Sequence, residues 1–202
     1  TQRNHVTTTC LNPSQAIVWT LLQIQNKEIL DIMELDVEDE DSIRLCFDKH
    51  KEKNRPIDLL FNNAGVIDWN DLFEVSISSV EKIYKVNLIG CLMVLRLAIP
   101  CLEKSIAPLI INLSSRLGSI DLRGETQLGG AIAYQCSKAA LNMLTKQAAI
   151  DLKPLKIRVI SQSPGWVKTE MGGVKAKYQV SEAVSMMLHS LNQLPSDQTG
   201  VF

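Results

Sequence analysis

Short runs of apolar residues alternate along the chain with longer segments in which apolar positions recur at a helical period. The strand-like runs are residues 5–10, 28–37, 57–65, 108–115 and 156–165, with a last run that begins at Thr199. The helical segments begin at Ser14 and then cover about 39–53, 78–105, 133–154 and 180–194. This alternation predicts βαβ units and a parallel sheet. Several strands are apolar almost throughout, as expected where helices cover both faces.

The pattern therefore predicts an α/β protein with a doubly wound parallel sheet, a Rossmann-like fold, in a single domain over residues 1–202. In such a sheet, ligands bind at the carboxyl ends of the strands. Small and polar residues follow four of the predicted strands: Asp36, residues 62–65 (NNAG), Ser114 with Ser115, and residues 163–165 (SPG). Turn formers end most strands. That alone does not explain the order in which Asn, Ser, Tyr and Lys occur here.

Composition narrows the class of protein. The 202 residues are 46% apolar and carry a net charge of −1, which indicates a globular domain and gives no support for nucleic acid or an anionic membrane as a partner. We find no uninterrupted apolar run of the length that a spanning helix needs and no signal-peptide core in residues 1–15, so a cytoplasmic protein is expected. The five cysteines are scattered, without a CxxC pair. We interpret them as small core residues and expect no metal site.

Tyr134 and Lys138 lie four positions apart in a predicted helix, so their side chains should share one face. A free phenol titrates near 10. An ammonium about 4 Å away would favour the phenolate by about 4 kcal/mol at an effective dielectric of ~20, and would lower the pKa of the phenol by roughly three units. The pair could then act as an acid/base catalyst. Taken alone it is a weak motif, because solvated helix faces produce it by chance.

The order of several motifs is more specific. Asn62-Asn63-Ala64-Gly65, Asn87, Ser115, Tyr134-x-x-x-Lys138 and Pro164-Gly165 occur in the sequence in this order, on the predicted strand ends and helices. This arrangement resembles the short-chain dehydrogenase/reductase family from about His5 onward. Residues 110–120 and 163–173, with a long insertion at 121–130, are similar to the sniffer-type and C-factor-like carbonyl reductases.

The resemblance implies roles for four catalytic residues. Tyr134 would exchange a proton with the carbonyl oxygen, and Lys138 would lower the pKa of Tyr134 and bind the nicotinamide ribose. Ser115, third after the Asn112 position, would donate a hydrogen bond to the substrate oxygen, and Ser114 would face the cofactor side or cap the strand. Asn87 would hold a water in a proton relay through Lys138. The alternative for Asn87 is a buried amide satisfied by the backbone.

The resemblance also implies a cofactor site. Asn62, Asn63, Ala64 and Gly65 would form the turn against the adenine ribose. Further contacts would come from Asp36 and Val37 to the adenine, from Tyr134 and Lys138, and from Pro164, Gly165, Val167 and Thr169 beside the nicotinamide. Trp166 would shape the substrate side or, as the commoner alternative, pack in the core.

Two features depart from the family pattern. The family begins with a strand and a TGxxxGxG turn that holds the pyrophosphate at a helix N-terminus, and this sequence has no such element. We expect that it is part of a longer polypeptide, because loss of the first strand would expose a central sheet edge. The subgroup also places a basic residue after the Cys of its second strand, and here Leu11 follows Cys10. The resemblance still places NADP ahead of NAD.

The predicted function is therefore reduction of a ketone, aldehyde or quinone with NADPH, and the predicted partner is a small-molecule carbonyl substrate. A homodimer is compatible with this prediction, because the two long helices form a dimer face in many relatives. The alternative is a non-catalytic regulatory or interaction protein that keeps the fold but binds the cofactor poorly. A Rossmann-like methyltransferase would explain the alternation of elements but would make the four matched residues accidental.

Overall fold

The computed structural model describes residues 4–123 and 129–202. It confirms the predicted Rossmann-like α/β class, because parallel sheets alternate with helices along the chain. The described residues form two compact units, one up to Arg55 and one from Pro56 onward. Each unit is described by itself below. The prediction of a single domain over residues 1–202 stays a prediction.

The first unit is a βαβ motif followed by a helix. Strands β1 (Val6–Cys10) and β2 (Leu30–Glu34) pair in parallel, and a 3₁₀ turn with helix α1 (Ile17–Gln25) connects them. Helix α2 (Glu40–Glu52) follows, and the Asp39 side chain caps it by accepting from the Asp41 amide. Apolar side chains of α2 supply much of the core of this unit: Ile43, Cys46 and Phe47.

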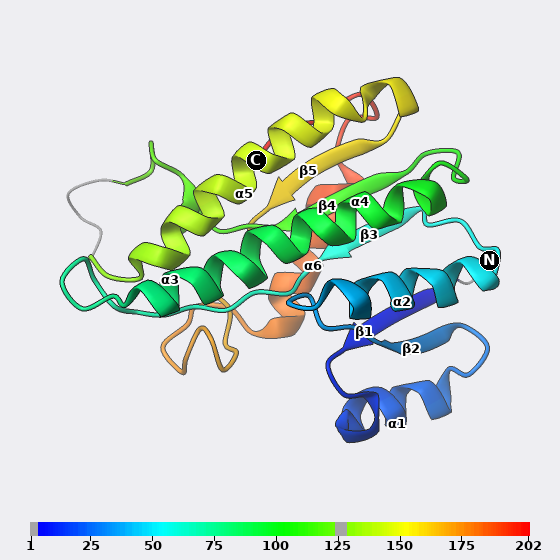
Figure 1. The fold of residues 1–202 in the computed structure, drawn as a ribbon, viewed down its shortest axis with the longest axis horizontal. Coiled ribbons are helices and arrows are strands. Elements are labelled where there is room, and N and C mark those ends of the chain that lie inside the picture. Colours follow the sequence, from blue (N-terminus) through cyan, green and yellow to red (C-terminus); the bar gives the residue numbers. More distant parts are fainter. Residues whose placement is uncertain (1–3, 124–128) are drawn as a thin grey trace. The chain divides into compact units, whose positions relative to one another are not determined.

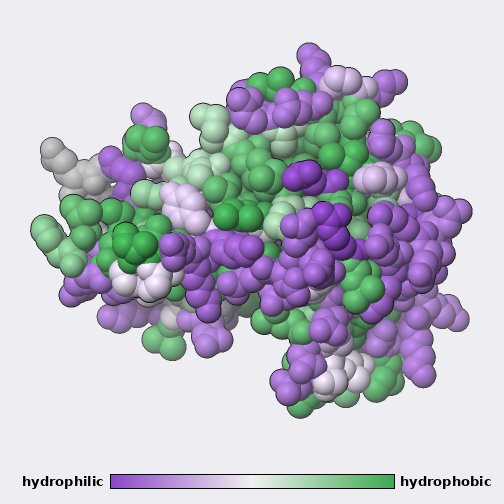
Figure 2. Space-filling model, in the orientation of Figure 1, coloured by the Kyte–Doolittle hydropathy of each residue, from purple (hydrophilic) through white to green (hydrophobic). Residues whose placement is uncertain are grey.

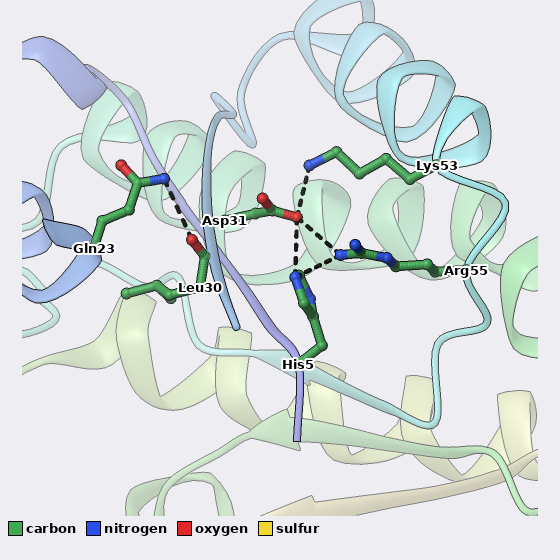
Figure 3. A network of polar contacts seen from close by, with 6 residues as sticks. All are labelled: His5, Gln23, Leu30, Asp31, Lys53 and Arg55. Atoms are coloured by element: carbon green, nitrogen blue, oxygen red, sulfur yellow. Dashed lines mark hydrogen bonds and ion pairs between the residues drawn. The ribbon is translucent and has the colours of Figure 1, made fainter. Parts of the chain in front are cut away.

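One carboxylate holds three basic groups together at the start of β2. Asp31 lies 2.7 Å from the Lys53 ammonium, 3.4 Å from Arg55 and 3.5 Å from His5 (Figure 3). Burial raises the pKa of Asp31, but the hydrogen bond and charge of Lys53, with the charges of His5 and Arg55, outweigh it and leave the pKa below its usual value. The cluster ties the chain after α2 to both strands of the unit.

The second unit is built on a three-stranded parallel sheet. Its strands β3 (Leu59–Asn62), β4 (Leu109–Leu113) and β5 (Arg158–Gln162) lie in that order. Helices α3 (Ile77–Tyr84), α4 (Cys91–Leu102) and α5 (Ile132–Asp151) lie in front of the sheet in Figure 1, whereas α6 (Val180–Asn192) lies behind it. Gln162 on β5 donates to the Met187 carbonyl of α6 at 3.1 Å.

The predicted helix 78–105 forms as one helical stretch, Ile77–Leu102, but with a change of winding in the middle. Residues Lys85–Gly90 adopt a π-helix between α3 and α4. The stretch is long and apolar enough to cross a membrane by length and composition, yet half of its most apolar window is buried inside the protein. Its inner side chains form much of the core of this unit: Ile83, Val94, Leu95, Ala98, Cys101 and Leu102.

A row of buried and half-buried polar side chains crosses the sheet of the second unit. Asn62, Asn112 and Ser161 occupy paired positions on three adjacent strands. The Asn62 amide donates to Asn112 Oδ1 at 2.8 Å, and the Asn112 amide donates to the Thr145 hydroxyl of α5 at 2.9 Å. That hydroxyl lies 2.7 Å from Ser161 Oγ. The Cys91 thiol also donates to Asn112 Oδ1, at 3.3 Å. Each of these polar groups therefore has a partner.

Two sequence-based expectations need correction. The run beginning at Thr199 is not a strand. The Thr199 hydroxyl takes the place of a backbone group by accepting from the Val159 amide, and the Gly200 amide donates to the Val159 carbonyl. The cysteines also differ from one another. Cys46, Cys91 and Cys101 are buried, but Cys10 is half-buried and Cys136 is exposed, so only three are core residues.

We predict that Asp31→Asn lowers the free energy of unfolding by about 1 kcal/mol at pH 7, because it leaves three basic groups without their shared carboxylate. The folded-state pKa of Asp31 lies below 3.8, so the stabilisation is present above that value and is lost as the pH falls through the folded-state pKa. Urea denaturation at several pH values measures it. Asp48→Asn, which removes an exposed ion pair with Lys51, is the control and should change stability by less. Equal effects of both substitutions would contradict a special role for the Asp31 cluster.

Candidate active site

The first turns of α5 bring the predicted catalytic residues of the second unit together. Tyr134 and Lys138 lie one turn apart on α5, and the Lys138 ammonium is 5.6 Å from the centre of the Tyr134 ring. Ser115, two residues after the end of β4, shares a hydrogen bond with the Tyr134 side chain. Asn87 enters from the π-helical segment. A Cβ placed on Gly65 would lie 3.4 Å from Asn87 Oδ1 and 3.6 Å from Lys138 Nζ, so these two side chains also converge.

Lys138 is a buried cation, with only 4% of its surface exposed. Its ammonium donates to the Leu113 carbonyl at the end of β4, at 2.7 Å. Burial lowers the pKa of Lys138 from 10.5 to about 8, with a small opposing effect of Cys91. The thiol itself has its pKa raised to about 12 by burial and is neutral at physiological pH. Lys138 is therefore charged at neutral pH and loses its charge under mildly alkaline conditions.

Tyr134 corrects one sequence-based expectation. We expected the Lys138 charge to lower the pKa of this phenol, but the pKa is raised. Burial of the ring, which is 8% exposed, is the larger cause, and the hydrogen bond with Ser115 offsets it only in part. The ammonium donates to the Leu113 carbonyl, and its charge is not among the causes that set the pKa of Tyr134. Tyr134 is therefore a protonated phenol at neutral pH.

The Asn87 carboxamide links two segments of the chain by hydrogen bonds. It accepts from the Val66 amide at 2.8 Å and donates to the Val66 carbonyl at 2.9 Å. It also donates to Ser137 Oγ at 3.0 Å, and that hydroxyl donates to the Tyr134 carbonyl at 2.7 Å. Both carboxamide atoms are thus engaged, as the backbone-satisfied alternative predicted. The relay water at this residue stays a prediction.

The two neighbouring serines have different surroundings. Ser114 is buried, and its hydroxyl donates to Asn142 of α5 at 2.6 Å. It therefore anchors the strand end to the helix, and the cofactor-side position that we had allowed for it stays a prediction. Ser115 is half-buried and accepts from the Leu117 amide at 3.1 Å while it meets Tyr134. Ser115 is the serine of this pair that lies in the candidate site.

The predicted cofactor residues of the second unit occupy the carboxyl edge of its sheet. Asn63, Ala64 and Gly165 are exposed there, whereas the Asn62 side chain is directed into the sheet toward Asn112. Asn62 could therefore contact a ligand through its backbone but not through its amide group. The half-buried residues Gly65, Pro164 and Val167 complete this edge.

The loop after β5 is held by its own hydrogen bonds. The exposed Thr169 hydroxyl accepts from the Gly172 amide at 3.1 Å, and the Val167 carbonyl accepts from the Thr169 amide at 2.9 Å. Trp166 is half exposed, and its indole donates to the Gly172 carbonyl at 2.8 Å. Trp166 is therefore not the packed core residue that we took as the commoner alternative.

Two predicted adenine contacts belong to the first unit. Asp36 lies just after β2, where its amide donates to the Ser42 hydroxyl and its carboxylate accepts from the Glu38 amide. Val37 follows it in the same turn. Their contact with a nucleotide stays a prediction. The insertion 121–130 is described only in part, because residues 124–128 lie outside the described residues.

Sequence reasoning missed three groups that support the site. A Cβ on Gly118 would come within 2.7 Å of Lys138 backbone and side-chain atoms, so only glycine allows α5 to approach this turn. Ser137 connects Asn87 to the Tyr134 backbone, and the Leu113 carbonyl receives the Lys138 ammonium. A glycine three residues after the predicted serine was a usable signal. A backbone carbonyl leaves no signal in sequence.

Comparison with known proteins identifies relatives of this chain. The family model described as short chain dehydrogenase matches residues 3–179. C-signal of Myxococcus xanthus is 34% identical over 148 residues, which cover 73% of this chain and 87% of that protein. An NADP-dependent (R)-specific alcohol dehydrogenase of Lentilactobacillus kefiri is 31% identical, over 73% of this chain and 58% of its own length. The chain spans about half the length of several other curated dehydrogenases that it matches, such as a cyclopentanol dehydrogenase at 53%.

Solved structures show the same fold. The NADPH-bound carbonyl reductase from chicken fatty liver superposes with a TM-score of 0.89 at 33% identity, and the match covers 98% of this chain and 83% of that one. Carbonyl reductase Sniffer of D. melanogaster gives 0.89 at 32% identity, with 98% and 84% covered. The family match, the relatives above 30% identity and these two structures agree with the predicted resemblance, and the chain belongs to the short-chain dehydrogenase/reductase family.

Proposed function

We propose that this protein is an oxidoreductase that reduces a ketone, aldehyde or quinone with NADPH, and that Tyr134 is the proton donor. The observation that carries the proposal is the state of Tyr134. It is a buried phenol whose pKa is raised, and it meets the Ser115 side chain on one side and lies one helical turn from the buried Lys138. A phenol that keeps its proton at neutral pH is suited to give that proton away as a carbonyl is reduced.

The relatives support the choice of substrate and cofactor. Two structures at 32–33% identity are carbonyl reductases, and one of them holds NADPH. A structure of a Burkholderia multivorans protein at 25% identity holds NADP, and the Lentilactobacillus kefiri relative is NADP-dependent. These findings favour NADP over NAD. Leu11, which replaces the expected basic residue of this subgroup, is the feature that argues the other way.

The residues present fit the nicotinamide end of such a cofactor. Gly65 leaves open the space next to Asn87 and Lys138 that a larger residue would occupy. The exposed residues at the ends of β3 and β5 are small, so a flat ligand can reach the strand ends. Lys138 and the backbone of Val167 would bind the ribose and carboxamide, and the nicotinamide, when bound, supplies the hydride. We propose no residue of this chain for the pyrophosphate.

The side chains divide the remaining chemistry among themselves. Ser115 would hydrogen-bond the carbonyl oxygen and stabilise the charge that develops on it. Tyr134 would transfer its phenolic proton to that oxygen and become a phenolate. The Lys138 ammonium would stabilise this phenolate and, with a pKa of about 8, can return a proton to it from solvent. Asn87 would hold the Tyr134 turn through Ser137.

Partner and compartment follow from the same proposal. The partner is a small carbonyl compound, and we propose a cytoplasmic protein. A homodimer through α4 and α5 is consistent with exposed apolar side chains on these helices, among them Leu92, Met143 and Ile150. Sedimentation velocity would measure the oligomeric state.

We predict that Tyr134→Phe lowers kcat for reduction of a quinone or aldehyde by about 10³-fold or more, because it removes the transferred proton but little volume. NADPH oxidation at 340 nm measures the rate, and nucleotide fluorescence measures binding, which should stay within about twofold. Tyr84→Phe removes a phenol outside the site and is the control. Equal rates in wild type and Tyr134→Phe would refute the catalytic proposal. Failure of the wild type to bind either nucleotide would instead favour the regulatory alternative.

We further predict that wild type gains stability relative to Lys138→Met as the pH rises from 7.5 to 10.5 without nucleotide. The folded-state pKa of about 8 lies below the unfolded value of 10.5. The unfolded chain therefore binds more protons in this window, and stability rises with pH. The change should be about 3 kcal/mol. Denaturation at each pH measures it, and Lys146→Met, which removes an exposed lysine two turns further along α5, controls for net charge. A difference that does not vary with pH would show that Lys138 is not a buried cation.

A further inference from the structure

The N-terminus of α5 has no side-chain cap of its own. Its N-cap residue is Ala131, which has no hydrogen-bonding side chain and adopts a left-handed backbone with φ of 50°. Alanine is a poor N-cap, because the first amide groups of a helix need acceptors. Tyr134 lies in this first turn, so whatever holds the turn also fixes the phenol.

Two backbone carbonyls of the loop after β3 accept from the first two amides of this turn. The Ala131 amide donates to the Trp69 carbonyl at 3.1 Å, and the Ile132 amide donates to the Asn70 carbonyl at 3.2 Å. Gly130 makes this approach possible. It has a φ of +91°, and a Cβ on it would lie 2.9 Å from the same Trp69 carbonyl. Both the backbone conformation and the space therefore require glycine at this position.

The loop that supplies these carbonyls is itself held at both ends. At its start, Val66 is bound through both backbone groups by the Asn87 carboxamide. Further along, Asp68 accepts from the backbone and side-chain amides of Asn70 and from the Ser79 hydroxyl of α3. These hydrogen bonds hold the pKa of Asp68 below its usual value, that from Ser79 most strongly. The two carbonyls are thus fixed relative to α3 and the π-helical segment.

The same loop carries an exposed apolar surface. Trp69, Leu72 and Phe73 are 58%, 69% and 92% exposed, and Figure 2 shows apolar residues at the end of this unit where the loop meets α3. One face of the loop is therefore open to contact, while its backbone holds the turn that carries Tyr134.

We infer that residues 66–70 and the Gly130–Ala131 turn form a positioning clamp that sets the place of Tyr134 against Ser115, with Gly130 as its positioning residue. The inference rests on the proposed function, and it adds to it a device that transmits the position of the loop to the proton donor. Gly130 and the two carbonyls touch neither substrate nor reacting atoms and act through Tyr134.

The test substitutes Gly130→Ala in the full-length protein, with Gly129→Ala as the matched control, because a Cβ on Gly129 would meet nothing within 4 Å. We expect kcat for quinone reduction to fall about 100-fold in Gly130→Ala, with little change in NADPH affinity and a melting temperature lowered by a few degrees, because alanine is strained at a φ of +91°. The hydrogen bond with Ser115 lowers the pKa of Tyr134. Because Tyr134 would move away from Ser115, the Tyr134 limb of the kcat profile, which lies above the Lys138 limb near pH 8, should shift to higher pH. Gly129→Ala should behave as wild type.

Hydrogen exchange of the amides of residues 131–135 separates this inference from the proposed function. Faster exchange in Gly130→Ala but not in Gly129→Ala, together with the shifted pH profile, supports the clamp. Unchanged exchange in Gly130→Ala overturns it, even if activity falls. Faster exchange with an unchanged kcat also overturns it, because Tyr134 would not depend on the turn. A wild type that binds NADPH but reduces no carbonyl would refute the proposed function, while the exchange data would still decide whether the clamp exists.

Discussion

The burial of the Lys138 ammonium is the constraint on which the site depends. An ion removed from water costs several kcal/mol unless polar groups replace its hydration, and here one strand-end carbonyl, that of Leu113, receives it. This placement requires α5 to lie close to the end of β4, which Gly118 permits because it has no side chain. It also leaves Lys138 with a pKa of about 8, near enough to neutrality for the group to give up or take up a proton.

The π-helical winding of Lys85–Gly90 sets the position of Asn87 in the site. In a regular α-helix each amide donates to the carbonyl four residues before it. A π-helical segment uses the carbonyl five residues before it, and this changes the direction of the side chains within one turn. The Asn87 carboxamide is thereby placed between Val66 and Ser137, where it binds both. Because both of its polar atoms are engaged, the residue holds the geometry of the site. The exposed loop and the helix turn of Tyr134 both depend on it.

Much of this arrangement could be predicted from sequence, and the failures have physical causes. Period and turn residues predicted the β and α elements, because burial dictates which positions are apolar. Motif order located Ser115, Tyr134 and Lys138. The π-helical segment was missed because its apolar pattern is the same as that of an α-helix. The pKa of Tyr134 was predicted with the wrong sign because a spacing of four residues says nothing about burial, which proved the larger effect. The run from Thr199 is not a strand, although Gly200 and Val201 make backbone hydrogen bonds with β5, because at Thr199 the side-chain hydroxyl accepts from the Val159 amide.

The row of polar side chains across β3, β4 and β5 has a consequence for the shape of the ligand edge. Asn62, Asn112 and Ser161 meet only when the three strands stand at one alignment. Sliding any strand by a single residue would turn its polar group to the opposite side of the sheet and leave its neighbours without partners. The row therefore fixes the register of the three strands. It keeps the carboxyl ends of the three strands level with one another, so that a ligand lying across them would meet a flat surface.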